Sequence, residues 1–171
     1  MDDQVEDDNA DKNDEAGFGR YLLMLVLVAV VVAVDQWTKS WAAETLPAEP
    51  ITLIEGLLSL QYAENTGAAF SLFQGGGQLI GVLAVAAVVL IVFSIRNLGR
   101  RAEVIAVSLI AAGAIGNLVD RIINGDGFLD GFVVDFVRLW EIPNFNVADS
   151  ALTVGATLLV ALALFSRPVS Q

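Results

Sequence analysis

The fold is decided by the apolar run Tyr21-Leu-Leu-Met-Leu-Val-Leu-Val-Ala-Val-Val-Val-Ala-Val34, which contains no charged residue. Three further apolar runs follow at residues 79–95, 104–119 and 151–165. Each is shorter than the roughly 20 residues that cross a bilayer, so polar residues must lie inside the spans. Four such runs in 171 residues leave too little polar sequence to cover them in water. We therefore predict four transmembrane helices, over about residues 20–41, 78–96, 102–123 and 147–167.

The composition supports a membrane protein and restricts its chemistry. The chain is 56% hydrophobic, with a mean hydropathy of +0.66, which is too apolar for a soluble domain. It has neither cysteine nor histidine, which removes disulfides, thiol nucleophiles, imidazole bases and the usual zinc ligands. Any catalysis must therefore use carboxylates, hydroxyls, lysine or arginine.

The acidic N-terminal tail differs in composition from everything after it. Eight acids and one lysine lie between Asp2 and Glu15, and they account for most of the net charge of −11. A stretch this polar cannot bury enough apolar area to offset its chain entropy. We predict a disordered, solvated tail over residues 1–19 and one membrane domain over residues 20–171.

The basic residues predict how the helices are oriented. Cytoplasmic loops are enriched in lysine and arginine. The flanking arginines are Arg20, Arg96, Arg100, Arg101 and Arg167, and all lie at one set of helix ends. We predict that these ends and both termini are cytoplasmic, whereas the polar helix ends face outward.

The two outward connections carry different patterns. The first contains Ile51-Thr-Leu-Ile54, the turn Glu55-Gly56 and Leu57-Leu-Ser-Leu-Gln-Tyr62, which predicts a β-hairpin within a β region over about residues 49–73. The second, residues 122–145, predicts an interfacial loop or helix. Its aromatic residues are Phe132, Phe136, Trp140 and Phe145. The predicted fold is an all-α polytopic membrane protein with a small extracytoplasmic sheet.

Polar residues at the outward helix ends have a structural and a functional interpretation. Asp35 and Lys39 lie four residues apart and can pair on one helix face. Gly113, Gly116, Asn117 and Asp120 share a face of the third helix. An ion pair from Asp120 to Lys39 or Arg121 is slightly favoured over a direct catalytic role. Asn117 and Arg121 suit the binding of a substrate backbone or head group.

The two carboxylates of greatest interest are Asp135 and Asp149, and neither has an adjacent basic partner in the sequence. Asn146 is a predicted N-cap, which places Asp149 in the first turn of the fourth helix. Two carboxylates brought together in a dry site share one proton and support general acid–base hydrolysis. We expect Asp149 to be the ionised member, because a helix N-terminus favours negative charge.

Five motifs in the same order resemble those of the bacterial lipoprotein signal peptidases (type II). They are Asp35-Gln-Trp-Thr-Lys39, Asn65-Thr-Gly-Ala-Ala-Phe70, Gly116-Asn-Leu-Val-Asp-Arg121, Val133-Val-Asp-Phe136 and Phe145-Asn-Val-Ala-Asp149. Each motif is weak alone, but all five at the outward ends of four helices are highly specific. The resemblance spans all of the chain except the tail.

The resemblance implies an aspartic endopeptidase of the bacterial cytoplasmic membrane that cuts prolipoproteins before a diacylglyceryl-modified cysteine. It implies no metal, no organic cofactor and no nucleic acid, a monomer among membrane lipids, and inhibition by the cyclic peptide globomycin. The implied catalytic residues are Asp135 and Asp149. The implied substrate-binding or site-shaping residues are Asn65, Gly67, Asn117, Arg121 and Asn146, and the implied supporting residues are Asp35, Lys39, Gly116 and Asp120.

Some features leave alternatives open. The stretch between Asp120 and Asp135 is longer than is usual in that family, so Asp130 competes with Asp135, which is preferred because Val-Val-Asp-Phe is the matching string. A small proton- or ion-coupled transporter would use the aspartates as a path. Against it, the acids gather at one surface and the second helix has no polar residue between Leu79 and Phe93. A non-catalytic scaffold that binds lipoproteins is the other alternative.

Overall fold

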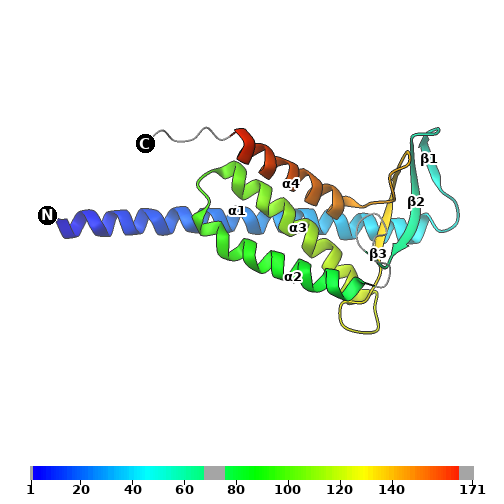
Figure 1. The fold of residues 1–171 in the computed structure, drawn as a ribbon, viewed down its shortest axis with the longest axis horizontal. Coiled ribbons are helices and arrows are strands. Elements are labelled where there is room, and N and C mark those ends of the chain that lie inside the picture. The colour runs from blue at the N-terminus through cyan, green and yellow to red at the C-terminus, as the bar shows by residue number, and fades with distance from the viewer. Residues whose placement is uncertain (1, 68–75, 166–171) are drawn as a thin grey trace.

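The computed structural model describes residues 2–67 and 76–165, with side chains from Gly17 onward. Figure 1 shows the long helices side by side and a small sheet across one end of them. In chain order the elements are α1 (Asp2–Thr45), β1 (Ile51–Ile54), β2 (Leu58–Asn65), α2 (Gly77–Ser94), the 3-10 helix η2 (Ile95–Asn97), α3 (Arg101–Ile123), β3 (Val133–Leu139) and α4 (Val147–Phe165).

Four helices in the described part of the chain are long and apolar enough to cross a membrane. The spans are Gly17–Thr45, Gly77–Asn97, Arg101–Ile123 and Val147–Phe165. Together with the sheet, they confirm the predicted fold class. Residues 166 and 167 of the predicted fourth helix, and residues 68–73 of the predicted β region, lie outside the described residues.

The helix α3 lies at the centre of the bundle. It packs against α1, α2 and α4, and half of the residues in its most apolar stretch are buried. Small residues allow α3 and α4 to approach closely. A side chain at Gly113 would clash with the carbonyl oxygen of Ala148, and a Cβ at Gly155 would lie 2.6 Å from that of Ala106. These contacts hold the first half of α4 closely against the first half of α3.

The three strands form one antiparallel sheet in the order β1-β2-β3. The predicted hairpin is present, and Gly56 adopts a φ of 70° in its turn, a conformation that glycine reaches without strain. The strand β2 then pairs with β3, with Ala63 opposite Asp135 and Asn65 opposite Val133. The sheet therefore carries Asn65 and Asp135 to the same edge of the bundle.

The second connection is a loop over residues 124–132 and then contains a strand that the prediction of an interfacial loop or helix did not include. Residues 133–139 form the strand β3, because β2 offers a free edge to this β-branched sequence. Phe136, expected at the membrane interface, is buried against Ala42 and Leu46. Trp140 fits the interface better, since 67% of its surface is exposed.

The helix α1 begins at Asp2 and so continues through the segment for which the sequence predicts a disordered, solvated tail. The disordered tail over residues 1–19 stays a prediction. Extending an existing helix needs no new nucleus, and each added residue gains a backbone hydrogen bond. The start of α1 and the end of α4 lie at the end of the bundle opposite the sheet (Figure 1). At that opposite end the guanidinium of Arg20 donates to the carbonyl of Arg96 at 2.7 Å.

Candidate active site

Asp135 and Asp149 converge on a single residue, Asn146. Asp135 lies on β3, and Asp149 lies in the first turn of α4. The side-chain Nδ2 of Asn146 donates to Oδ1 of Asp135 at 2.7 Å. The backbone N–H of Asn146 donates to Oδ2 of Asp149 at 3.3 Å. The two carboxylates therefore meet across one buried asparagine, where the sheet crosses the helix ends.

Asn146 is also the N-cap of α4. Its Oδ1 accepts the backbone N–H of Asp149 at 2.8 Å, while Asp149 accepts the backbone N–H of Asn146. This reciprocal pair is a capping box, with Asp in the place usually taken by Glu or Gln. It holds the Asp149 carboxylate at the positive end of the helix dipole.

Asp135 occupies a buried and polar position. Only 2% of its surface is exposed, and Nδ2 of Asn65 donates to its Oδ2 at 2.9 Å. Burial, and next the negative charge of Asp149, raise the pKa of Asp135 to about 7. The hydrogen bond from Asn65, the positive charge of Lys39 and the hydrogen bond from Asn146 act in the opposite direction. Asp135 is therefore protonated in a substantial fraction of molecules near neutral pH.

Asn117 connects the carboxylates to a buried cation. Its Oδ1 accepts from Nζ of Lys39 at 3.0 Å and from Nδ2 of Asn146 at 3.2 Å. Because its oxygen is used in this way, its Nδ2 is left to donate to Oδ1 of Asp149, at 2.8 Å. Lys39 thus sets the direction of the Asn117 amide.

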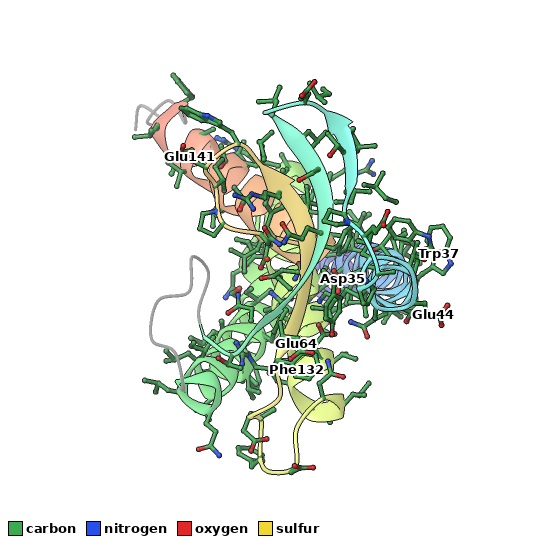
Figure 2. All side chains as sticks on the ribbon, turned by 90° about the vertical axis from the view of Figure 1, so that its right-hand side faces the viewer. Asp35, Trp37, Glu44, Glu64, Phe132 and Glu141 are labelled. Atoms are coloured by element: carbon green, nitrogen blue, oxygen red, sulfur yellow. The ribbon has the colours of Figure 1, made fainter. Side chains whose placement is uncertain are left out.

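Lys39 and its two acidic partners form a frame beneath the sheet. Lys39 Nζ lies 2.8 Å from Oδ2 of Asp35 and 3.0 Å from Oδ2 of Asp120. Asp35 Oδ1 accepts the backbone N–H of Ala148, and Asp120 Oδ2 accepts that of Val134. Each acid therefore holds the residue that precedes one of the two candidate catalytic aspartates. In Figure 2, Asp35 points from α1 toward the other helices, whereas Trp37 points away.

Two further residues complete the frame. A Cβ at Gly116 would lie 2.7 Å from Oδ2 of Asp35, so glycine provides the room for that carboxylate. Gln36 was not singled out from the sequence, although its Nε2 donates to Asp120 at 2.9 Å and to the Gly116 carbonyl at 3.2 Å. Its position inside the Asp35 motif is the only sequence signal that could have identified it.

Arg121 has a role other than the ion pair with Asp120 that the sequence allowed. Its guanidinium is buried and donates to the carbonyls of Gly67 at 2.6 Å and Gly131 at 3.1 Å. Gly67 is held in turn by a hydrogen bond from its N–H to Oδ1 of Asn65. Asp130 lies outside this cluster and accepts the backbone N–H of Gly127 in its own loop.

A pocket of about 250 Å³ opens beside Asp149. Its polar lining comes from Asn65, Gly67, Asn117, Arg121 and Asp149. The rest is apolar and belongs mainly to α2 and α3, including Leu83, Ala87 and Ile110. A pocket with these walls fits an apolar peptide segment: the apolar wall can contact its side chains, and the polar residues can bind its backbone amides beside the carboxylate of Asp149.

The chemistry available here is proton transfer by carboxylates. Within the described residues, no group of three or more His, Cys, Asp or Glu side chains is arranged to hold a metal. Every buried side-chain polar atom in that part of the chain has a partner. Two carboxylates with fixed hydrogen bonds, one of which has its pKa raised to about 7, can activate a water molecule and protonate a leaving group.

The family comparison matches most of the chain. A sequence profile described as Signal peptidase (SPase) II matches residues 27–165. A protein named lipoprotein signal peptidase from Rhodococcus jostii is 39% identical over 170 residues, covering 93% of this chain and 86% of that protein. One of the same name from Bifidobacterium longum is 41% identical over 155 residues, covering 89% of this chain and 84% of that protein.

Solved structures with a similar fold are bacterial membrane enzymes. One, determined by the in meso method at 2.3 Å resolution, has a TM-score of 0.75 and 29% identity, covering 83% of this chain and 87% of that one. Another, at 1.9 Å resolution, has a TM-score of 0.73 and 28% identity, covering 85% of this chain and 94% of that one.

Proposed function

Because the chain belongs to the signal peptidase II family, we propose that it is an aspartic endopeptidase that cuts prolipoproteins immediately before a lipid-modified cysteine. Membership of the family, together with the four apolar helices, makes it a bacterial multi-pass membrane protease that removes signal peptides from prolipoproteins. The use of two aspartates and the position of the cut are the proposal. The observation that carries it is the meeting of Asp135 and Asp149 on Asn146.

The two aspartates are assigned different protonation states. Asp149 is the ionised member, because it lies at a helix N-terminus and accepts hydrogen bonds from Asn117 and Asn146. Asp135 is the protonated member, because burial raises its pKa to about 7. The pair titrates as a unit, so this describes its resting arrangement.

Hydrolysis then follows the acid–base logic of such a pair. Asp149 takes a proton from water, and the resulting hydroxide attacks the scissile carbonyl carbon while Asp135 donates its proton toward the carbonyl oxygen. The tetrahedral intermediate collapses, the C–N bond breaks, and the amine leaves with the proton that Asp149 had taken. Asp135 recovers its proton from the hydroxyl as the carboxylic acid product forms. Neither aspartate forms a covalent bond to the substrate.

The residues around the pocket bind and orient the substrate. Asn65 and Asn117 each keep a polar atom close to the aspartates, and Gly67 lies on the pocket wall. Arg121 holds Gly67 and Gly131 in place and thereby shapes that wall. The signal peptide lies in the apolar part of the pocket, between α2 and α3.

The proposed orientation places the aspartates on the extracytoplasmic side. Arg96, Arg100 and Arg101 belong to the connection at the end opposite the sheet, and basic loops are cytoplasmic. Both termini are then cytoplasmic, and the site works at the outer surface of the cytoplasmic membrane. The substrate reaches it from the surrounding lipid, and the enzyme acts as a monomer.

The test is cleavage of a diacylglyceryl-modified lipoprotein precursor by the purified, reconstituted protein. Wild type should release the signal peptide, and globomycin should inhibit it. Asp135→Asn and Asp149→Asn should each lose at least about a thousandfold in kcat. Asp130→Asn is the matched control and should keep its activity.

Three results would contradict the proposal. Full activity of either active-site variant would reject the assigned pair. Loss of wild-type cleavage on addition of a metal chelator would reject the carboxylate-only mechanism. Ion flux in proteoliposomes without any cleavage would favour a transporter.

A further inference from the structure

A second pocket, of about 460 Å³, lies against another part of α4. Its walls come from the last residue of β3 (Leu139), from the segment after β3 (Ile142, Pro143, Asn144, Phe145) and from the first two turns of α4 (Asp149, Ser150, Leu152, Thr153, Val154). We call it the α4 groove. We propose that the α4 groove receives an acyl chain of the substrate's diacylglyceryl group. This assignment rests on the proposed function and names a binding site for the lipid part of the substrate.

The polar groups in the α4 groove are already in use. Ser150 donates its hydroxyl hydrogen to the carbonyl of Asn146 at 2.9 Å, and Thr153 donates its own to that of Asp149 at 2.8 Å. Asn144 donates to the carbonyl of Gln61 at 3.1 Å. Apart from the carboxylate of Asp149 at one end, the remaining walls are mainly apolar side chains. A ligand recognised here gains mainly from apolar contact, which is the property of an acyl chain.

The position of the groove suits a chain that comes from the bilayer. Val154 lies five residues beyond Asp149, roughly 7.5 Å farther along the helix axis and toward the opposite end of the span. It is 57% exposed, on a helix long and apolar enough to cross a membrane. An acyl chain can therefore enter sideways from lipid and end at the membrane surface beside Asp149, without crossing water.

The two pockets meet at Asp149 and Leu152, which line both. A scissile bond at Asp149 has the signal peptide on one side and the modified cysteine on the other. The smaller pocket contains Asn65, Asn117 and Arg121, which suit a peptide. The α4 groove is larger, and its side-chain donors Ser150, Thr153 and Asn144 already bind backbone carbonyls, which suits the lipid. The geometry therefore separates peptide and lipid on either side of the candidate catalytic carboxylate.

The experiment narrows the groove with a bulky residue and varies the acyl chain. Val154→Trp should raise KM roughly tenfold for a long-chain diacylglyceryl precursor, as expected when about two methylenes lose their contact. It should leave KM for a short-chain precursor nearly unchanged. Val160→Trp is the control, since Val160 lies on the same helix with 58% exposure and does not line the groove.

A second variant approaches from the opposite wall. Ile142 is 41% exposed in the segment after β3, and Ile142→Trp should give the same chain-length dependence as Val154→Trp. Unchanged KM in both variants, or an equal rise for both precursors, would overturn the assignment. An equal effect of Val160→Trp would show a bilayer effect and would also overturn it. In these cases wild-type cleavage continues, so the proposed function stands. Absence of wild-type cleavage would instead reject both.

Discussion

Asp35 on the first helix accepts the backbone N–H of Ala148 on the fourth at 2.8 Å, with both residues fully buried. Asp120 accepts the N–H of Val134 in the same way. Both carboxylates contact Lys39, so one cation holds the backbone just before each of the two candidate catalytic aspartates. The spacing of Asp135 and Asp149 thus depends on the positive charge of Lys39, which is far from both aspartates in the sequence.

Removing that cation should destabilise the protein. Lys39→Met leaves two buried carboxylates without their counter-charge, which costs about 3–5 kcal/mol in comparable sites. The unfolding temperature in detergent should fall clearly, and cleavage should fall with it. The variant with Asp35→Asn, Lys39→Met and Asp120→Asn together removes all three charges and should recover part of the lost stability. Equal unfolding temperatures for Lys39→Met and wild type would contradict the frame.

Asn146→Ala tests the contact between the two aspartates. The substitution removes the N-cap, worth about 1 kcal/mol, and the side-chain bond to Asp135. We expect a moderate loss of stability and a loss of roughly a hundredfold in kcat, because small displacements of reacting groups are costly. Asn97→Ala, an exposed change at the opposite end of the bundle, should behave as wild type. A stability loss with kcat intact would limit Asn146 to a capping role.

The sequence predicted the features that depend on local spacing. Long apolar runs identified the four helices, and the four-residue interval from Asp35 to Lys39 indicated their ion pair. The N-cap at Asn146 followed from the residue type and the apolar run after it.

Features that depend on distant partners could not be predicted in the same way. The strand β3 forms because β2, about 70 residues earlier, leaves an edge free, and nothing near Asp135 encodes that pairing. The amide direction of Asn117 depends on Lys39, which is 78 residues away. Arg121 binds backbone carbonyls, which carry no sequence signal. The candidate site residues were therefore identified by resemblance, and their connections only by the structure.

The protonation of Asp135 predicts a pH dependence for cleavage. Burial raises the pKa of Asp135 to about 7, and the mechanism requires its protonated form. Above this value kcat/KM should fall about tenfold for each further pH unit. The measurement is kcat/KM between about pH 5 and about pH 9, with the lipid phase kept constant. A rate that continues to rise up to about pH 9 would exclude Asp135 as the acid.

The same group predicts how stability depends on pH. Between about 3.9, the pKa of an unfolded aspartate, and about 7, the folded state keeps a proton that the unfolded state releases. The stabilisation from this proton is complete below that window and is lost as pH rises through about 7. Asp135→Asn cannot ionise, so its unfolding temperature should exceed that of wild type more at about pH 8 than at about pH 5. Asp126→Asn, an exposed control, should show no such change.

Gly116→Ala tests whether the frame tolerates any added atom. The new Cβ would lie 2.7 Å from Oδ2 of Asp35 and 3.0 Å from Cβ of Ala148, so it would push Asp35 from its bond to the start of α4. We expect a loss of about 1–3 kcal/mol in stability, together with reduced cleavage. Gly19→Ala is the matched change in a helix, because nothing lies within 4 Å of its added Cβ. Alanine there should stabilise the helix by about 0.5–1 kcal/mol. If stability falls for Gly116→Ala and rises for Gly19→Ala, the loss at Gly116 is attributed to the contact with Asp35. A gain in stability at both positions would instead show that α3 and α1 can separate without consequence.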